Sequence, residues 1–331
     1  MIGFQTNIID ATACKLMAHA ITTRRGDAEI FMHPYVRGLI EDCQAYGDLL
    51  AQANTTALKY GVIDLTGAIA AATAEGSLPA ATTITPATVN ATPARQAVLL
   101  EPSDDEARRL PALRIMGEIS NLVSNPPTSF SPAQLSLIAM AVTMGIGALQ
   151  NWIVAALKAS VSSLTNTFGT TGVAMTYNAY RAGVNARRDA GARGRGLCLD
   201  VRSNGWGSIE SDILSLGGAV QMSALGKSLV DRNDDTSIYT DVYGNTDVMV
   251  TTGLPTSGGD THGGLFLPGC QVLHLSAPPP VGNRRVILQT PMFSIFELGY
   301  AGGSVAQYEV VFWGSLDIVQ QVAGAKEIHV T

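Results

Sequence analysis

Three short glycine-containing stretches come closest to known motifs for phosphate or cofactor chemistry. Gly226-Lys227-Ser228 ends like a phosphate-binding loop, but that loop needs a glycine five positions earlier, where Gln221 stands. Gly194-Arg195-Gly196 lacks the third glycine of a dinucleotide fingerprint, because Leu199 occupies that position. The stretch 302–306 fails the nucleophile-elbow pattern at its last residue. The sequence therefore gives no support to nucleotide binding or to this type of serine chemistry.

Histidine, cysteine and acidic residues are also poorly placed for catalysis or metal binding. Asp260 and His262, with a nearby serine, would suffice for a hydrolytic site, but a single histidine in a glycine-rich loop is more often solvated. None of the five histidines has metal-ligand spacing. The four cysteines are scattered, which indicates neither a zinc site nor a disulfide framework, so we expect reduced, partly buried thiols. We expect no catalytic residue, no cofactor and no metal.

The charged feature most suggestive of a function is a basic cluster between residues 181 and 202. It contains Arg187, Arg188, Arg193 and Arg195. Two interpretations remain open: a solvated loop paired with acidic neighbours, or a contact to nucleic-acid phosphates. The net charge of −6 argues against nucleic-acid binding by the surface as a whole.

The composition indicates a surface that is largely covered by other protein. Charged residues make up 15% of the 331 residues, against about 25% in ordinary soluble chains, and aromatic residues only 6%. The mean hydropathy lies above zero. An alanine-rich enzyme is the alternative interpretation of this composition.

The rest of the chain is organised around a long helix predicted over Ser131–Leu164. Ser131, Pro132 and Gln134 form a typical helix start. Apolar residues then recur at steps of three and four, while the opposite side carries small or weakly polar residues, so the helix needs protein on both sides. A membrane span is the alternative, but Gln150 and Asn151 interrupt the apolar run and no basic cluster flanks it.

Other periodic segments predict helices in the first two thirds of the chain and strands in the last third. The predicted helices are 34–50, 61–75, one that begins at 102–106, a segment after the turn 166–172 that ends near 188, and 208–216; between 75 and 100 we expect a loop with short strands. The predicted strands of the last third are a hairpin around 243–246 and runs at 270–275, 285–290, 293–298, 305–320 and 328–330. Helices followed by strands, without βαβ alternation, predict an α+β fold.

A non-catalytic, low-charge α+β chain with an extended start, a long central helix, a glycine-rich hairpin and a strand-rich end resembles the major capsid proteins of tailed bacteriophages. Within that family it looks most like the shell proteins of Bordetella-type short-tailed phages. The resemblance implies the Johnson, or Hong Kong 97-like, fold: a peripheral domain with a spine helix on a sheet, an axial domain, an N-terminal arm and an extended hairpin loop. It also implies a homo-oligomeric icosahedral shell around double-stranded DNA, a separate scaffolding protein, a cement protein outside, and no membrane.

Mapped onto this chain, the resemblance implies five segments. These are an N-terminal arm at 1–30, a helical region at 31–130, the central helix and axial-type region at 131–232, the extended hairpin loop at 233–282, and C-terminal strands of the peripheral sheet at 283–331. The family generally places the hairpin before the spine helix, so either the order is unusual or the helix at 34–50 is the spine. The candidate contacts between subunits are Tyr239, Val242, Val248, Val250, Arg284 and Arg285.

Some relatives join a lysine of the extended loop to an asparagine of a neighbour. The chain has five lysines, and none lies between Ser228 and Ala325. We therefore expect a shell held by non-covalent contacts alone.

Overall fold

The computed structural model describes residues 25–53, 58–62, 87–101, 132–215, 238–240, 246–278, 284–289, 292–301 and 305–331. Helices dominate the first part and strands the last, so the predicted α+β class is confirmed. The helices are α2 (Arg25–Met32), α3 (Pro34–Ala53), α6 (Pro132–Ser160), α7 (Tyr177–Asp189) and α8 (Gly207–Ser215). The strands are β1 (Leu58–Val62), β2 (Ala87–Ala91), β3 (Ala94–Leu100), β4 (Thr167–Gly169), β5 (Gly196–Asp200), β6 (Ile238–Thr240), β7 (Thr246–Val250), β8 (Thr256–Ser257), β9 (Asp260–Phe266), β10 (Gln271–Ser276), β11 (Arg285–Gln289), β12 (Ser294–Ala301), β13 (Val305–Ile318) and β14 (Gly324–Val330).

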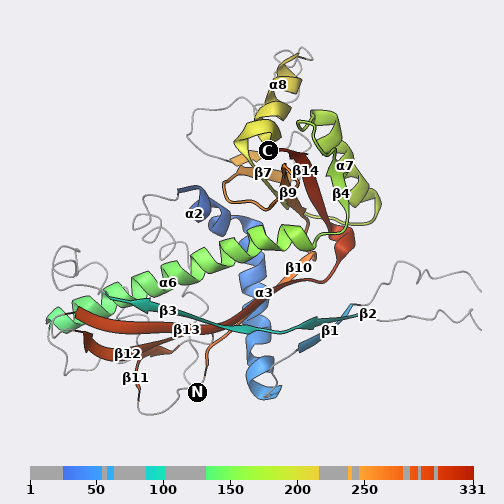
Figure 1. Cartoon of the computed structure of the whole chain (residues 1–331). Coiled ribbons are helices and arrows are strands. Elements are labelled where there is room, and N and C mark those ends of the chain that lie inside the picture. The colour runs from blue at the N-terminus through green and yellow to red at the C-terminus, as the bar shows by residue number, and fades with distance from the viewer. Residues whose placement is uncertain are drawn as a thin grey trace, which may run out of the picture.

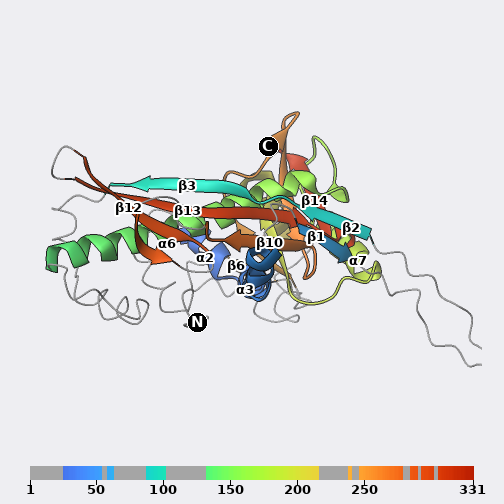
Figure 2. The same ribbon diagram turned by 90° about the horizontal axis from the view of Figure 1, so that it is seen from below.

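The long predicted helix is present as α6, and it lies along a five-stranded antiparallel sheet (Figure 1). The 14-residue strand β13 is the middle of this sheet; it pairs with β10 and β12, and β3 also pairs with it. Figure 2 shows α6, β3 and β13 running side by side. We call this helix and its five-stranded sheet the elongated lobe. Both long helices contact this sheet: α6 runs along β13, β3 and β12, whereas α3 packs against β10. Since α6 is the helix that follows the long strands, it holds the place of the spine helix.

Two glycines allow α6 to approach the sheet closely. A Cβ atom on Gly145 of α6 would lie 2.8 Å from a methyl group of Val310 in β13. A Cβ atom on Gly314 of β13 would lie 2.5 Å from the ring of Trp152 in α6. That ring packs edge-on against Phe312, with 5.2 Å between the ring centroids. Both contacts lie beside the apolar stripe of α6, and not on the small or weakly polar side noted from the sequence.

A compact second lobe is built on a seven-stranded mixed sheet with the order β4-β14-β9-β5-β7-β6, and β8 pairs with β9 at the side. The helices α7 and α8 cover one face of this sheet (Figure 1). Under them Tyr180, Val184 and Ile209 pack against Cys198 and Leu265. The opposite face belongs to the core that continues into the elongated lobe.

The helices α2 and α3 join the two lobes. Residues Ile30 and Phe31 of α2, and Tyr35, Val36 and Leu39 of α3, are buried in one continuous core with α6 and both sheets. His33 and Pro34 separate the two helices, because proline lacks the amide proton that a continuous helix would use. The predicted helix 34–50 is confirmed. No helix within the described part of the chain is both long enough and apolar enough to cross a membrane.

A separate two-stranded hairpin, β1 paired with β2, lies beyond the sheet at the end opposite β11 and β12 (Figures 1 and 2). It precedes α6 in the chain. This placement removes the conflict of chain order, because the projecting hairpin comes before the long helix and not after it.

Several expected boundaries are wrong. Residues 25–30, expected in an extended arm, are helical, and residues 61–62, expected in a helix, belong to β1. The segment 233–282 is not a projecting loop in its described part: β7, β9 and β10 are integral strands, buried by partners on both sides or by the core. In the segment 283–331, β11 to β13 belong to the five-stranded sheet, but β14 pairs with β9 in the other sheet. Residues 1–24, residues 63–75, the helix expected to begin at 102–106, and Ser131 lie outside the described residues.

Candidate functional site

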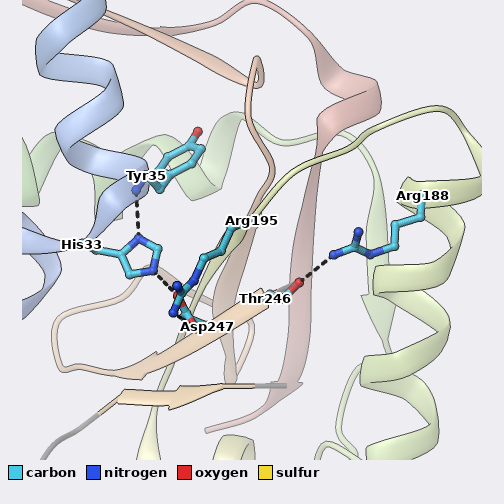
Figure 3. A network of polar contacts seen from close by, with 6 residues as sticks. All are labelled: His33, Tyr35, Arg188, Arg195, Thr246 and Asp247. Carbon is cyan, nitrogen blue, oxygen red and sulfur yellow. Dashed lines mark hydrogen bonds and ion pairs between the residues drawn. The ribbon is translucent and has the colours of Figure 1, made fainter. Parts of the chain in front are cut away.

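The four named arginines of the basic cluster lie at the end of α7 and in the loop that leads to β5, and each has a partner in the same chain. Arg195 donates two hydrogen bonds to the carboxylate of Asp247, from Nε to Oδ2 at 2.6 Å and from Nη2 to Oδ1 at 3.1 Å (Figure 3). Arg188 donates to the Thr246 hydroxyl at 3.4 Å. Arg187 donates to the Val322 carbonyl and Arg193 to the carbonyls of Arg188 and Ala192. The interpretation with an acidic partner therefore holds for Arg195.

Asp247 is the centre of this network, since its buried carboxylate also meets His33. The His33 Nε2 atom lies 2.6 Å from Asp247 Oδ2, and its Nδ1 atom accepts the backbone N–H of Tyr35 at 3.1 Å (Figure 3). Since Nδ1 accepts this N–H, Nε2 is the ring nitrogen that donates to the carboxylate of Asp247. The hydrogen bond and the charge of Asp247 raise the pKa of Arg195. The network thereby ties the break between α2 and α3 to β7 and to the basic loop.

The candidate subunit contacts on β6 and β7 are placed differently from the expectation. The sequence predicted the hairpin correctly, because β6 pairs antiparallel with β7. Val248, however, is 0% exposed in a strand that pairs on both sides, so it is not available to a neighbouring chain. Val250 is half-buried on the same strand and packs against the core under α7. Tyr239 lies on β6, the last strand of the sheet, and Val242 lies outside the described residues.

Arg284 and Arg285 have ion-pair partners on other strands of the same sheet. Arg284 pairs with Glu309, which also binds Arg95 of β3 at 2.9 Å, and Arg285 lies 3.3 Å from Glu297. The three arginine side chains remain about half exposed, near 48–49%. They could still contribute to a contact between subunits, and that role stays a prediction.

Sequence reasoning missed the strand β3, which has the properties of an interaction edge. One side of β3 pairs with β13, and no other strand among the described residues pairs with it. Its side chains are mostly exposed, including two large apolar ones, Val98 at 36% and Leu99 at 53%. An edge with open backbone groups and exposed apolar side chains is a template for another strand. The signal was present as a run of apolar residues ending at Leu100, which the sequence assigned only to short strands.

A second missed feature is a buried polar cluster in the compact lobe, formed by Cys198 and Asp200 of β5 and Glu327 and His329 of β14. Burial, and then the charge of Asp200, raise the pKa of Glu327 well above its usual range. Burial also raises the pKa of Asp200, partly offset by His329. For His329 burial acts to lower the pKa, but the interactions with Asp200 and the Val330 carbonyl outweigh it and the pKa is raised. Cys198 and Glu327 are 129 positions apart in the sequence, and no short motif signals their meeting.

The chain matches no protein-family model and no curated protein sequence. It is similar to several solved structures. Among them are a holo-SrpI encapsulin complex from Synechococcus elongatus PCC 7942 (13% identity, 82% of each chain covered, TM-score 0.44) and the capsid of Ralstonia phage GP4 (10% identity, 83% of this chain and 84% of that one, TM-score 0.44). The capsid asymmetric unit of Cyanophage A-1(L) is also similar (13% identity, 83% and 88% covered, TM-score 0.44). Since the TM-scores lie below 0.5, the proposals below are argued from the residues and elements of this chain.

Proposed function

We propose that the chain is a major capsid protein, which assembles into hexamers and pentamers of an icosahedral phage shell around double-stranded DNA. The observation that carries the proposal is the arrangement of the elongated lobe. A 29-residue helix lies along a sheet of long strands, and a hairpin that precedes this helix projects beyond the sheet. This is the combination of spine helix, peripheral sheet and extended hairpin that the sequence resemblance implies.

The hairpin β1–β2 supports assembly because such an element is weak alone. Its strands form a two-stranded sheet, separate from the two larger sheets. An isolated two-stranded hairpin is marginally stable in water and needs further strands or a covering surface. A neighbouring subunit would supply that surface.

The edge strand β3 also supports assembly into a shell. Val98 and Leu99 expose apolar area next to open backbone groups, on the same lobe as the hairpin. The low charge of the whole chain favours the same conclusion, because a surface that contacts other copies needs fewer charged groups. Non-covalent pairing of strand edges and burial of these side chains would then hold the shell together.

Several finer statements belong to the same proposal. The chain would be located in the virion after assembly in the bacterial host cytoplasm, with a scaffolding protein during assembly and a cement protein outside. Arg187, Arg188 and Arg193 would contact DNA phosphates on the inner face. The printed contacts of Arg187 and Arg193 support this, because they are made to backbone carbonyl oxygens, which carry no full negative charge. Nearness to Bordetella-type phages stays a prediction.

The test is assembly of the full chain, co-expressed with its scaffolding protein, followed by sedimentation and negative-stain microscopy. We expect closed shells of megadalton mass. A double variant V98K/L99K places charges on the β3 edge, and it should fold as a monomer but lose assembly at least about tenfold. V173K is the matched control, because Val173 is similarly exposed (49%) but lies in the compact lobe.

Three results would contradict the proposal in different ways. A stable monomer under all such conditions would remove the capsid function. Rings or tubes in place of closed shells would favour another virion structural protein, of the tail or portal type. Full assembly of the V98K/L99K variant would show that shells form without the β3 edge. A hydrolytic enzyme is the weaker alternative, since within the described residues the His262 ring donates no hydrogen bond to Asp260, whose carboxylate accepts the backbone N–H of Gly172.

A further inference from the structure

Three neighbouring strands bring two acids and a histidine together inside the compact lobe. In the sheet order, β9 lies between β5 and β14. On one side, Gly263 of β9 pairs with Glu327 of β14. On the other side, Gly264 pairs with Leu199 of β5, so the adjacent residue Gly263 lies opposite Asp200. Directly paired residues share a face of the sheet, so the two carboxylates flank a residue without a side chain. A Cβ atom on Gly263 would lie 2.7 Å from Glu327 Oε2, so only glycine leaves this space open.

The polar atoms that face one another in this cluster are buried and incompletely paired. Asp200, Glu327 and His329 are each 0% exposed. Asp200 Oδ2, Glu327 Oε1 and His329 Nε2 have no hydrogen-bond partner. Buried polar atoms without partners are costly, and each calls for a group that satisfies it. The other oxygens are occupied: Asp200 Oδ1 accepts the Val201 N–H at 2.6 Å, and Glu327 Oε2 accepts the Cys198 thiol at 3.6 Å.

The histidine is held in the orientation of a metal ligand. Its Nδ1 atom lies 2.8 Å from the backbone carbonyl of Val330, which can only accept, so Nδ1 carries the proton of the neutral ring. The lone pair of Nε2 then points into the cluster. A histidine that binds a metal usually donates its other ring N–H to a carbonyl or carboxylate in this way.

The spacing of the atoms fits a small divalent ion. One ligand atom from each of the three residues lies within 4.8 Å of the others. Nε2 of His329 is 3.2 Å from Asp200 Oδ1, close to the roughly 3.3 Å between neighbouring ligands of a tetrahedral ion with bonds near 2.0 Å. These two atoms form an ion pair when the ring is protonated, and a divalent ion would take the place of that proton. An imidazole among the ligands favours a transition metal over Mg²⁺ or Ca²⁺, which prefer oxygen alone.

We propose that Asp200, Glu327 and His329 bind one divalent transition-metal ion, Zn²⁺ or Mn²⁺, which joins β5 to β14 across β9. The ion would satisfy the three unpartnered atoms and balance the two carboxylates. It would also fix the last strand of the chain in the sheet, so its role is structural. The site lies under α7 and α8, apart from the β3 edge and the hairpin that the capsid proposal uses, and neither proposal requires the other.

The test measures metal content and thermal stability of the full-length protein, purified without chelators. Elemental mass spectrometry should find about one ion of Zn or Mn per chain, and E327Q should contain less than about a tenth of that. After treatment with a chelator, Tm should fall, and added Zn²⁺ or Mn²⁺ should restore it by at least about 5 °C. H262Q is the matched control, because His262 lies on β9 but on the opposite face, and it should keep the metal and the Tm shift.

E327Q separates this proposal from a metal-free cluster that shares protons. Glutamine has the shape of a protonated glutamate, so without a metal E327Q would leave Tm unchanged. With a metal site, E327Q lowers Tm and abolishes the response to added ions. Wild-type protein that contains neither ion and whose Tm responds to neither would overturn the proposal. Should E327Q fail to fold, the chelator and add-back series on the wild-type protein decides alone.

Discussion

At the scale of single residues, the partners of the functional-looking side chains were beyond the reach of the sequence. The arginines of the basic loop could be recognised as a cluster, but Arg195 is paired with Asp247, 52 positions away, and Asp247 with His33, 214 positions away. Likewise Glu327 and His329 are two positions apart, as neighbours on one face of a strand, but Asp200 reaches them only through the sheet. Pairing between distant strands has no signature in a single sequence.

The expectation of reduced, partly buried cysteines can be made sharper. Cys43, Cys198 and Cys270 are free and buried, and Cys14 lies outside the described residues. Burial raises the pKa of Cys43 and of Cys270 to about 12. A thiol reacts as its thiolate, so burial lowers the reactive fraction at pH 8 by about a thousandfold, in addition to blocking access.

We predict that iodoacetamide at pH 8 leaves Cys43 and Cys270 unmodified in native protein and alkylates both in urea, as peptide mass spectrometry will show. The sign of the pH effect follows from the raised pKa values. The unfolded chain loses these protons near pH 9 and the folded chain near pH 12, so the free energy of unfolding falls as the pH rises through this interval. Labelling at the same rate with and without urea would show that these thiols are accessible.

At the scale of elements, helices were predictable and strand partners were not. The helices α3, α6, α7 and α8 follow from apolar residues at steps of three and four, a local pattern. The strand β5 was missed because it is only five residues long and buried throughout, so it shows no alternation. The extended hairpin loop was expected in the wrong segment for a related reason. The strands β6 and β7 do pair as predicted, but the sequence could not show that β7 lies inside a sheet.

The contact of α6 with the sheet can be tested at Gly145. In G145V the new side chain would collide with Val310, which is fully buried in β13, so we expect a loss of about 1–3 kcal/mol of stability. G38A in α3 is the matched control, because nothing lies within 4 Å of its new Cβ atom and alanine favours a helix, so stability should rise by about 0.5–1 kcal/mol. Both values come from urea unfolding monitored by circular dichroism. An unchanged midpoint for G145V would mean that α6 does not rest on β13 at this point.

At the scale of the whole molecule, composition was the most informative property of the sequence. Low charge and small residues on the long helix predicted extensive contact with protein. Part of that contact is internal, since α6 is covered by the sheet on one side and by α2 on another. The rest of the expected protein contact would be made between subunits, at the β3 edge and the projecting hairpin.

The placement of the hairpin changes the basis of the expectation that the shell has no covalent links. That expectation rested on the absence of lysine from residues 228–325, but the projecting hairpin is β1–β2, and Lys59 lies in β1, paired in register with Asn90 of the same chain. A lysine amine titrates near 10.4 and is almost entirely protonated at neutral pH unless burial lowers its pKa. A link therefore needs a neighbour that both buries this amine and presents an activated amide.

We predict that boiling assembled particles in detergent gives a single band of monomer mass, because strand pairing and apolar contacts do not survive those conditions. The variant K59R keeps the positive charge but removes the amine nucleophile, so it should assemble and give the same single band. A ladder of higher oligomers that persists after reduction would contradict the prediction. Its disappearance in K59R would then assign the link to Lys59, and its persistence would show that the link does not use Lys59.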